Sequence, residues 1–125
     1  MISWRRRMPS SGISAAQREL CRRFGVEASP PGQRTMVGFA VSRPRTLEPL
    51  NALRHPIAGR SNGWFVWRGS EIPQEDDHFF HPLHIEHLDT YAPELAPYLA
   101  LPPGWRVLVA PGYEDVWHDD ELTGI

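Results

Sequence analysis

The histidines include a run whose spacing suggests metal chemistry. His78, His81, His84 and His87 follow one another at intervals of three residues. Imidazoles three positions apart on a helix share a face, so His84 and His87 could both reach one zinc ion, completed by a nearby aspartate. However, Pro82 places the first two histidines before the expected helix, and the His-Glu-x-x-His spacing of zinc enzymes is absent. A metal-dependent enzyme built on His78, His84, His87 and the aspartates therefore stays an alternative, and no metal or cofactor is expected.

Clustered carboxylates are a second possible source of chemistry. They are concentrated in three places, Asp76-Asp77, Glu114-Asp115 and Asp119-Asp120-Glu121. Paired acids can act as general acid and base or bind a divalent ion. No substrate pocket is evident from the sequence, and solvated acidic turns are the usual explanation of such pairs. We therefore expect no catalytic residues among them.

A third pattern, Gly59-Arg60-Ser61-Asn62-Gly63, has the spacing of the nucleophile elbow of serine hydrolases. That elbow needs its serine between a strand and a following helix, whereas this segment follows a proline-rich stretch and precedes a strand. We also expect a chain of 125 residues to be too short for that fold. Ser61-Asn62-Gly63 is therefore predicted to form a turn, and we expect that the protein is not an enzyme.

The tryptophans indicate a different kind of site. Trp64 and Trp67 are three positions apart, so on a regular strand their side chains point to opposite faces of the sheet. Most tryptophans on strands belong to a core, but an exposed one near acidic residues is typical of a protein-binding hot spot. Trp67 and Trp117 are the two candidates for such an anchor.

Charge is divided unevenly along the chain. Residues 1–68 contain 12 arginines against three glutamates, a balance of +9, whereas residues 69–125 contain one arginine against 12 acids, a balance of −11. An arginine-mediated nucleic-acid-binding module is a second alternative, but most of the arginines are scattered in expected loops. The other interpretation is that the two halves pack together and largely compensate one another.

The elements that must position these residues are short. Ser14 is the expected N-cap of a first helix, with Gln17 completing a capping box and Gly25 ending the helix. Alternation and turn residues predict strands, and other segments are expected to be helical; the strands are 36–42, 64–68, 105–109 and 113–117, and the helical segments are 50–53, 82–89 and 94–99. Without a βαβ rhythm, this mixture predicts an α+β fold with a small, mostly antiparallel sheet, an N-terminal helix and a central helical segment, rich in loops.

The chain is about as long as one average domain. We expect residues 1–12 to be a disordered extension and residues 13–125 to form a single domain. One cysteine excludes an intrachain disulfide framework, and no run of 18 apolar residues is present to span a membrane. The basic start has no apolar stretch behind it and so does not look like a secretory signal. A reduced, cytoplasmic protein is the simplest expectation.

Several strings taken in order resemble a known family. They are Val37-Gly-Phe-Ala40, Pro49-Leu-Asn-Ala-Leu-Arg-His-Pro56, Gly63-Trp-Phe-Val-Trp67, Phe80-His-Pro-Leu-His-Ile-Glu-His-Leu88, Tyr98-Leu-Ala-Leu-Pro-Pro-Gly-Trp-Arg106 and Tyr113-Glu-Asp-Val-Trp117. Together they resemble the bacterial immunity proteins of polymorphic-toxin systems, specifically immunity family thirty-three, over residues 14–122. The resemblance implies a non-enzymatic cytoplasmic protein that binds a cognate toxin domain and blocks it.

With a toxin as partner, the acidic and aromatic second half becomes the expected binding surface. Carboxylates can steer association with a basic toxin cleft, and buried aromatics would supply most of the binding energy. No membrane partner is expected, and nucleic acid is not the expected partner. The predicted partner-binding residues are Trp67, Glu71, Asp76, Asp77, His84, His87, Glu114, Asp115, Trp117 and Asp119.

Overall fold

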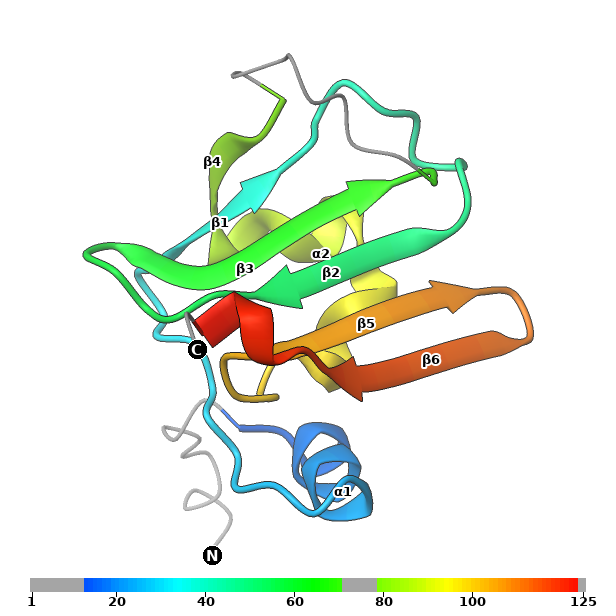
Figure 1. Ribbon diagram of the computed structural model, residues 1–125. Coiled ribbons are helices and arrows are strands. Elements are labelled where there is room, and N and C mark those ends of the chain that lie inside the picture. Colours follow the sequence, from blue (N-terminus) through cyan, green and yellow to red (C-terminus); the bar gives the residue numbers. More distant parts are fainter. Residues whose placement is uncertain (1–12, 71–78, 124–125) are drawn as a thin grey trace, which may run out of the picture.

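The computed structural model describes residues 13–70 and 79–123 of the chain. They form a six-stranded sheet with the strand order β4-β1-β3-β2-β5-β6 (Figure 1). Every neighbouring pair is antiparallel except β1 and β3, which run parallel. The predicted α+β fold with a small, mostly antiparallel sheet is thus confirmed. The strands are β1 (Met36–Phe39), β2 (Leu50–Arg54), β3 (Ser61–Arg68), β4 (His81–His84), β5 (Trp105–Ala110) and β6 (Tyr113–His118).

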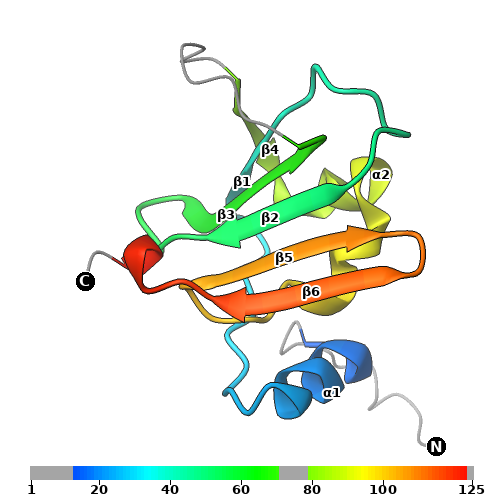
Figure 2. The same ribbon diagram turned by 45° about the vertical axis from the view of Figure 1, so that its right-hand side comes forward.

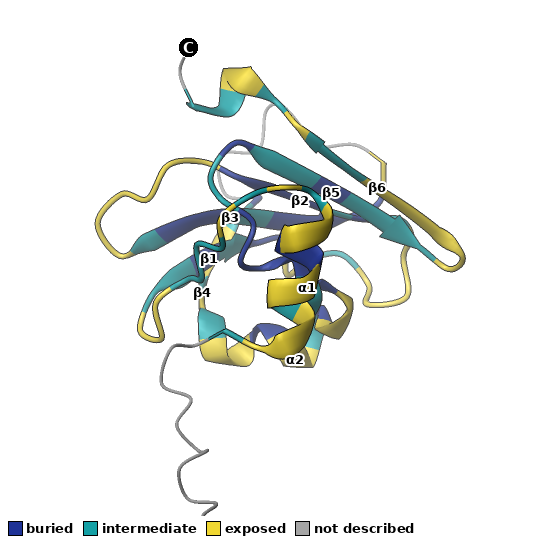
Figure 3. Ribbon diagram, turned by 90° about the horizontal axis from the view of Figure 1, so that it is seen from below, coloured by how far each residue is buried: buried dark blue, intermediate teal, exposed yellow. Residues whose placement is uncertain are grey.

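Short helices lie on both sides of this sheet. One side carries α1 (Ala15–Arg23), α2 (Leu88–Tyr91) and the 3-10 segment η3 (Pro93–Tyr98), while η4 (Asp120–Thr123) lies on the other side (Figure 3). A further 3-10 turn, η2 (Ile85–His87), leads from β4 into α2. None of the helices within the described ranges is long and apolar enough to cross a membrane.

The first helix begins where the capping signal predicts. The Ser14 hydroxyl oxygen accepts a hydrogen bond from the Gln17 backbone N–H (3.1 Å), and the Gln17 side chain accepts one from the Ser14 N–H (3.2 Å). This capping box satisfies two backbone donors at the start of the helix. The Gln17 amide also donates to the Ala96 carbonyl (2.8 Å), which ties α1 to η3.

We call the sheet side covered by α1, α2 and η3 the helix face. Its side chains make the main hydrophobic core, which includes a fully buried Trp64 whose indole N–H donates to the Leu99 carbonyl (3.0 Å). Strand residues on one hand, and residues of the helices and their connecting segments on the other, contribute in similar numbers, so the sheet and its covering layer stabilise one another. Buried members of this core include Val37, Phe39, Leu50, Ala52, Val66 and Val107 from the strands and Leu20, Leu88, Leu95 and Leu101 from outside them.

One arginine is buried inside the same core. Arg54, at the end of β2, is fully buried, and its guanidinium donates to the carbonyls of Asn62 (2.9 Å), Ser29 (2.5 Å) and Leu101 (2.8 Å). Burial lowers the pKa of Arg54 to about 10. Because Ser29, Asn62 and Leu101 belong to separate segments, this one side chain holds three parts of the chain together.

We call the opposite side the open face, because no α-helix covers it in the described residues. A smaller cluster lies there, formed by Ala40, Leu53, Trp67 and Phe79 with Phe65, Phe80 and Leu122 packed against them. The prediction that Trp64 and Trp67 point to opposite faces is therefore confirmed, but neither is exposed. Phe65 lies across β1 at Gly38, where an added Cβ would be 2.6 Å from the ring.

Two helical predictions are wrong because the segments form strands. Residues 50–53 belong to β2, an inner strand apolar on both faces, and such short apolar runs are easily mistaken for helix. Pro82 lies in β4 rather than in the first turn of a helix spanning 82–89. Since β4 is an edge strand, the missing N–H of Pro82 is tolerated there. The helical geometry begins only at Ile85.

The predicted turn at Ser61-Asn62-Gly63 is instead the beginning of β3. Gly63 has a φ of +94°, and an added Cβ would be 1.9 Å from the His55 carbonyl oxygen, so only glycine fits this close approach. The Ser61 hydroxyl oxygen accepts from the Gly63 N–H (3.1 Å) and the Asn62 side chain accepts from the Trp64 N–H (3.0 Å). The residues thus keep the local hydrogen bonds of a turn while pairing as a strand.

Candidate functional site

The β5–β6 hairpin lies at one edge of the sheet (Figure 2). It carries the predicted site residues Glu114, Asp115 and Trp117, and Asp119 follows it directly. Its register sets Arg106 opposite Trp117, Leu108 opposite Asp115 and Ala110 opposite Tyr113. Val107 belongs to the main core, so its side chain points to the helix face. Since side chains alternate along a strand, Arg106, Leu108 and Ala110 and the residues opposite them point to the open face. Asp115 and Tyr113 are exposed, and Trp117 is half-buried.

Arg106 connects Trp117 to Asp119 on this face. Its guanidinium carbon lies 5.5 Å from the centre of the Trp117 ring, a cation–π arrangement, and its Nη1 donates to Asp119 Oδ2 (3.0 Å). The other Asp119 oxygen accepts from the Glu121 N–H (3.0 Å). The hydrogen bond from Arg106, followed by that from Glu121, lowers the pKa of Asp119. Trp117 is thereby held in place with part of its ring open to solvent.

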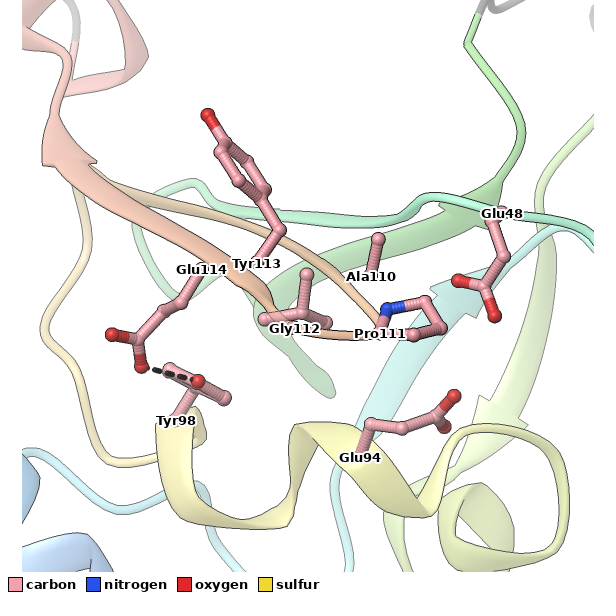
Figure 4. Close-up of a pocket in the computed structure, with 9 residues that line it drawn as sticks. Glu48, Glu94, Tyr98, Ala110, Pro111, Gly112, Tyr113 and Glu114 are labelled. Carbon is pink, nitrogen blue, oxygen red and sulfur yellow. Dashed lines mark hydrogen bonds between the residues drawn. The ribbon is translucent and has the colours of Figure 1, made fainter.

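A pocket of about 410 Å³ lies between the hairpin turn and η3 (Figure 4). Three carboxylates line it, those of Glu48, Glu94 and Glu114, around the turn at Pro111. Figure 4 shows Glu48 and Glu94 on one side of Pro111 and Glu114 with Tyr98 on the other. Val109 and Ala110 add apolar wall, so the pocket combines negative charge with hydrophobic surface.

Two of the pocket carboxylates have partners within the protein. Glu114 accepts hydrogen bonds from the Tyr98 hydroxyl (2.5 Å) and from Arg23 (2.5 Å), and these bonds lower its pKa. Burial, reinforced by Glu114, raises the pKa of Tyr98 to about 12. Burial raises the pKa of Glu94, but hydrogen bonds from Arg68 (3.0 and 3.1 Å) outweigh it and the pKa is lowered. At neutral pH the carboxylates of Glu94 and Glu114 are therefore charged and the Tyr98 hydroxyl is protonated. The third carboxylate, that of Glu48, is exposed at the rim of the pocket.

The two histidines singled out by spacing lie at the other edge of the sheet. His84 ends β4 and His87 ends η2, so they do not share one helix face as the sequence suggested. Their ring centres are 6.1 Å apart and both side chains are exposed. In ranges 13–70 and 79–123, no three or more His, Cys, Asp or Glu side chains come together to hold a metal ion. His78 lies outside the described residues.

The predicted site therefore does not form one surface. Glu114, Asp115, Trp117 and Asp119 lie on or just after β6, with Glu114 on the helix face and the other three on the open face. His84 and His87 end β4 and η2, five strand spacings or about 24 Å away. Trp67 is only 5% exposed, because Phe79 and Phe80 pack against it, whereas Trp117 keeps more of its surface in solvent. Glu71, Asp76 and Asp77 lie outside the described residues.

The structure adds residues that sequence reasoning missed. Arg106 could have been predicted from the sequence. A two-residue turn at Pro111-Gly112 sets a hairpin register in which Arg106 lies opposite Trp117. Tyr98 and Glu94 reach the pocket from η3 through tertiary packing, which no local pattern announces. Glu48 likewise joins the site from the segment before β2.

Comparison with known proteins identifies a family but supplies no individual relative. The model of the Imm33-like domain matches residues 16–119. No curated protein and no solved structure matches the chain. The family match extends from the second residue of α1 to the end of the hairpin region and includes all six strands. The chain therefore belongs to the Imm33-like domain family.

Proposed function

We propose that this chain is an immunity protein that binds a cognate bacterial toxin domain and neutralises it by occlusion in the cytoplasm. Family membership supports the class of function. The observation that carries the choice of surface is that the β5–β6 hairpin presents a half-buried tryptophan and an exposed aspartate on its open face and borders a carboxylate-lined pocket on its other side. The protein acts by binding, not by catalysis.

Trp117 is the proposed anchor. Binding energy at protein interfaces is concentrated in a few large side chains, and tryptophan and arginine are the most frequent of these. Arg106 and Asp119 fix the orientation of the Trp117 ring before binding, which reduces the entropy lost when a partner covers it. The open face on which Trp117 lies has no α-helix of its own to compete for this ring within the described residues.

Asp115 and the pocket acids are the proposed charge complement. Asp115 is exposed on the open face and Glu48 is exposed at the pocket rim, so both carboxylates are accessible to a partner. A toxin that acts on nucleic acid or nucleotides presents a basic cleft, and surface acids accelerate association with such a cleft. Glu114 and Asp119 are already bound to Arg23 and Arg106, so they contribute less than the exposed acids.

The test is protection of cells that express the toxin domain encoded next to this gene, together with pull-down of that domain. Trp117→Ala and Asp115→Lys are expected to weaken toxin binding by at least about tenfold, with folding retained. Asp89→Lys is the matched control, because Asp89 is an exposed aspartate on α2, away from the hairpin. Full protection by both hairpin variants would show that the toxin binds elsewhere. Absence of any binding by the unchanged protein would overturn the proposed function itself.

A further inference from the structure

The two edges of the sheet differ in how well they can accept another strand. β4 has four residues and contains Pro82, which has no N–H to donate. β6 has six residues and no proline, and it pairs with β5 residue for residue without a register shift. Edge strands in natural proteins are usually short or interrupted, so a regular edge such as β6 needs a partner or another means of protection.

The hydrogen-bond pattern shows which backbone groups of β6 are directed outward. The Asp119 N–H donates to the Gly104 carbonyl (2.7 Å), and this pair continues the β5–β6 register. Since backbone groups alternate in direction along a strand, Asp115 and Trp117 also bond to β5. Glu114, Val116 and His118 therefore direct their N–H and C=O groups away from the sheet.

We propose that β6 pairs antiparallel with β6 of a second copy of this chain, about a twofold axis at Val116. At an outward-directed residue such as Val116, the N–H and C=O groups of the two copies meet directly on the axis. Centred on Val116, the pairing sets Val116 against Val116 of the second copy and Glu114 against His118. On the other face it sets Asp115 against Trp117. No carboxylate faces a carboxylate in this register.

The other registers are disfavoured by the same side chains. An axis at Glu114 would oppose the two Glu114 carboxylates directly, which is destabilising in a cross-strand pair. An axis at Asp115 would oppose the two Asp115 carboxylates in the same way, and an axis at Trp117 would set Asp115 against Asp119. An axis at His118 would pair Val116 with Asp120, where the chain has already entered η4. Parallel pairing in register would place Glu114 beside Glu114 and Asp115 beside Asp115. The charge pattern of β6 thus favours one antiparallel arrangement.

The outer edge of β6 is not paired with any other strand in the described residues. Seen from below in Figure 3, β6 is visible along its length and α1 lies on the helix side of the sheet. The hydrogen bonds of Glu114 to Tyr98 and Arg23 use its carboxylate and leave its backbone groups unaffected. Pairing would join the two open faces into one continuous surface. Such a dimer does not require that the protein bind a toxin.

Sedimentation of the full chain over a range of concentrations tests the proposal. The unchanged protein is expected to reach twice the monomer mass as concentration rises. Val116→Pro removes an outward N–H from each copy and should weaken dimerisation at least about tenfold. Val116→Ala is the matched control, since it shortens the same side chain but keeps the N–H. A monomeric unchanged protein, or a Val116→Pro variant as dimeric as Val116→Ala, would overturn the proposal.

Amide hydrogen exchange supplies a test that needs no variant. Exchange should become slower as protein concentration rises at the outward-directed amides, those of Glu114, Val116 and His118. The exchange rates of the Asp115 and Trp117 amides should not change. Equal behaviour of the two sets would contradict strand pairing. Protection of the outward amides only when the toxin domain is added would assign the edge to a toxin strand and refute the dimer. Toxin protection by Val116→Pro is measured separately, so failure of the dimer leaves the proposed function intact.

Discussion

The helix face and the open face of this sheet are built from similar residues but bury them differently. Trp64 on the helix face is fully buried, and its indole N–H is bonded to a carbonyl. Trp117 on the open face is half-buried and is held by a guanidinium that itself remains partly exposed. The same side-chain type therefore serves as core on the helix face and as partly accessible surface at the hairpin end of the open face, where the smaller cluster that buries Trp67 does not reach. What differs is the layer of helices, not the strands.

Buried charge follows the same division. Arg54 and Arg68 lie on the helix face with little or no exposure, and Arg68 pairs with Glu94. Arg106 on the open face pairs with Asp119, and both side chains keep about a quarter of their surface in solvent. A charge that has lost its water depends on its partners far more than one that has kept it. The helix face should therefore be the more sensitive of the two to substitution.

Removal of Arg54 should have the largest effect. Arg54→Ala leaves the carbonyls of Asn62, Ser29 and Leu101 without their donor and opens a cavity beside Trp64. We expect a loss of about 3–5 kcal/mol in the free energy of unfolding, measured by urea titration. Arg106→Ala on the open face is the matched comparison and should cost much less. Equal losses of unfolding free energy in the two variants would contradict the greater dependence of the buried arginine on its partners.

Gly38→Ala should have the next largest effect, and it tests a close contact of the open face. The added methyl would lie 2.6 Å from the Phe65 ring, which must move. We expect a loss of about 1–3 kcal/mol. The cost should shrink when Phe65 is first replaced by Leu, because the ring edge is then absent; a double-mutant cycle measures this coupling. Independent effects of the two substitutions would exclude the contact as the cause.

Acidification compares the two ion pairs directly and should give a smaller effect. The pKa values of Glu94 and Asp119 are both lowered in the folded protein, so each carboxylate stabilises the fold at neutral pH. That stabilisation is lost as pH falls below about 5 and through the lowered pKa values. Urea titrations at several pH values measure how much free energy of unfolding is lost on acidification. Glu94→Gln should reduce this loss more than Asp119→Asn, because the Arg68 partner of Glu94 is buried and the Arg106 partner of Asp119 is not. The reverse order would contradict the contrast in burial.

Much of the fold was predictable because its signals are local. The capping box at Ser14 and Gln17 and the turn at Pro111-Gly112 specify α1 and the β5–β6 hairpin from a few neighbouring residues. The errors arose where tertiary context decides. Pro82 is acceptable in β4 only because that strand is at an edge, and 50–53 is a strand only because β3 and β5 flank it.

The candidate site was predictable in part for the same reason. Asp115, Trp117 and Asp119 lie close together in sequence, and the hairpin brings Arg106 to them. The pocket acids Glu48 and Glu94 come from distant segments, and nothing in their local sequence indicates that they meet. The distance between His84 and the hairpin follows from strand order, which spacing alone does not reveal.

Truncation of Trp117 should have the smallest effect on stability and is the sharpest test of the contrast between the faces. Trp117→Ala removes a half-exposed ring and one cation–π contact, so we expect a loss of about 1 kcal/mol. Trp64→Ala is its matched counterpart and should lose about 3–5 kcal/mol, because the whole ring and the bond to Leu99 are lost from the core. Thermal and urea unfolding of both variants provides the comparison. If Trp117→Ala costs as much as Trp64→Ala, the ring is needed to hold the fold and is not free to serve a partner; a small cost combined with lost toxin binding separates the two roles.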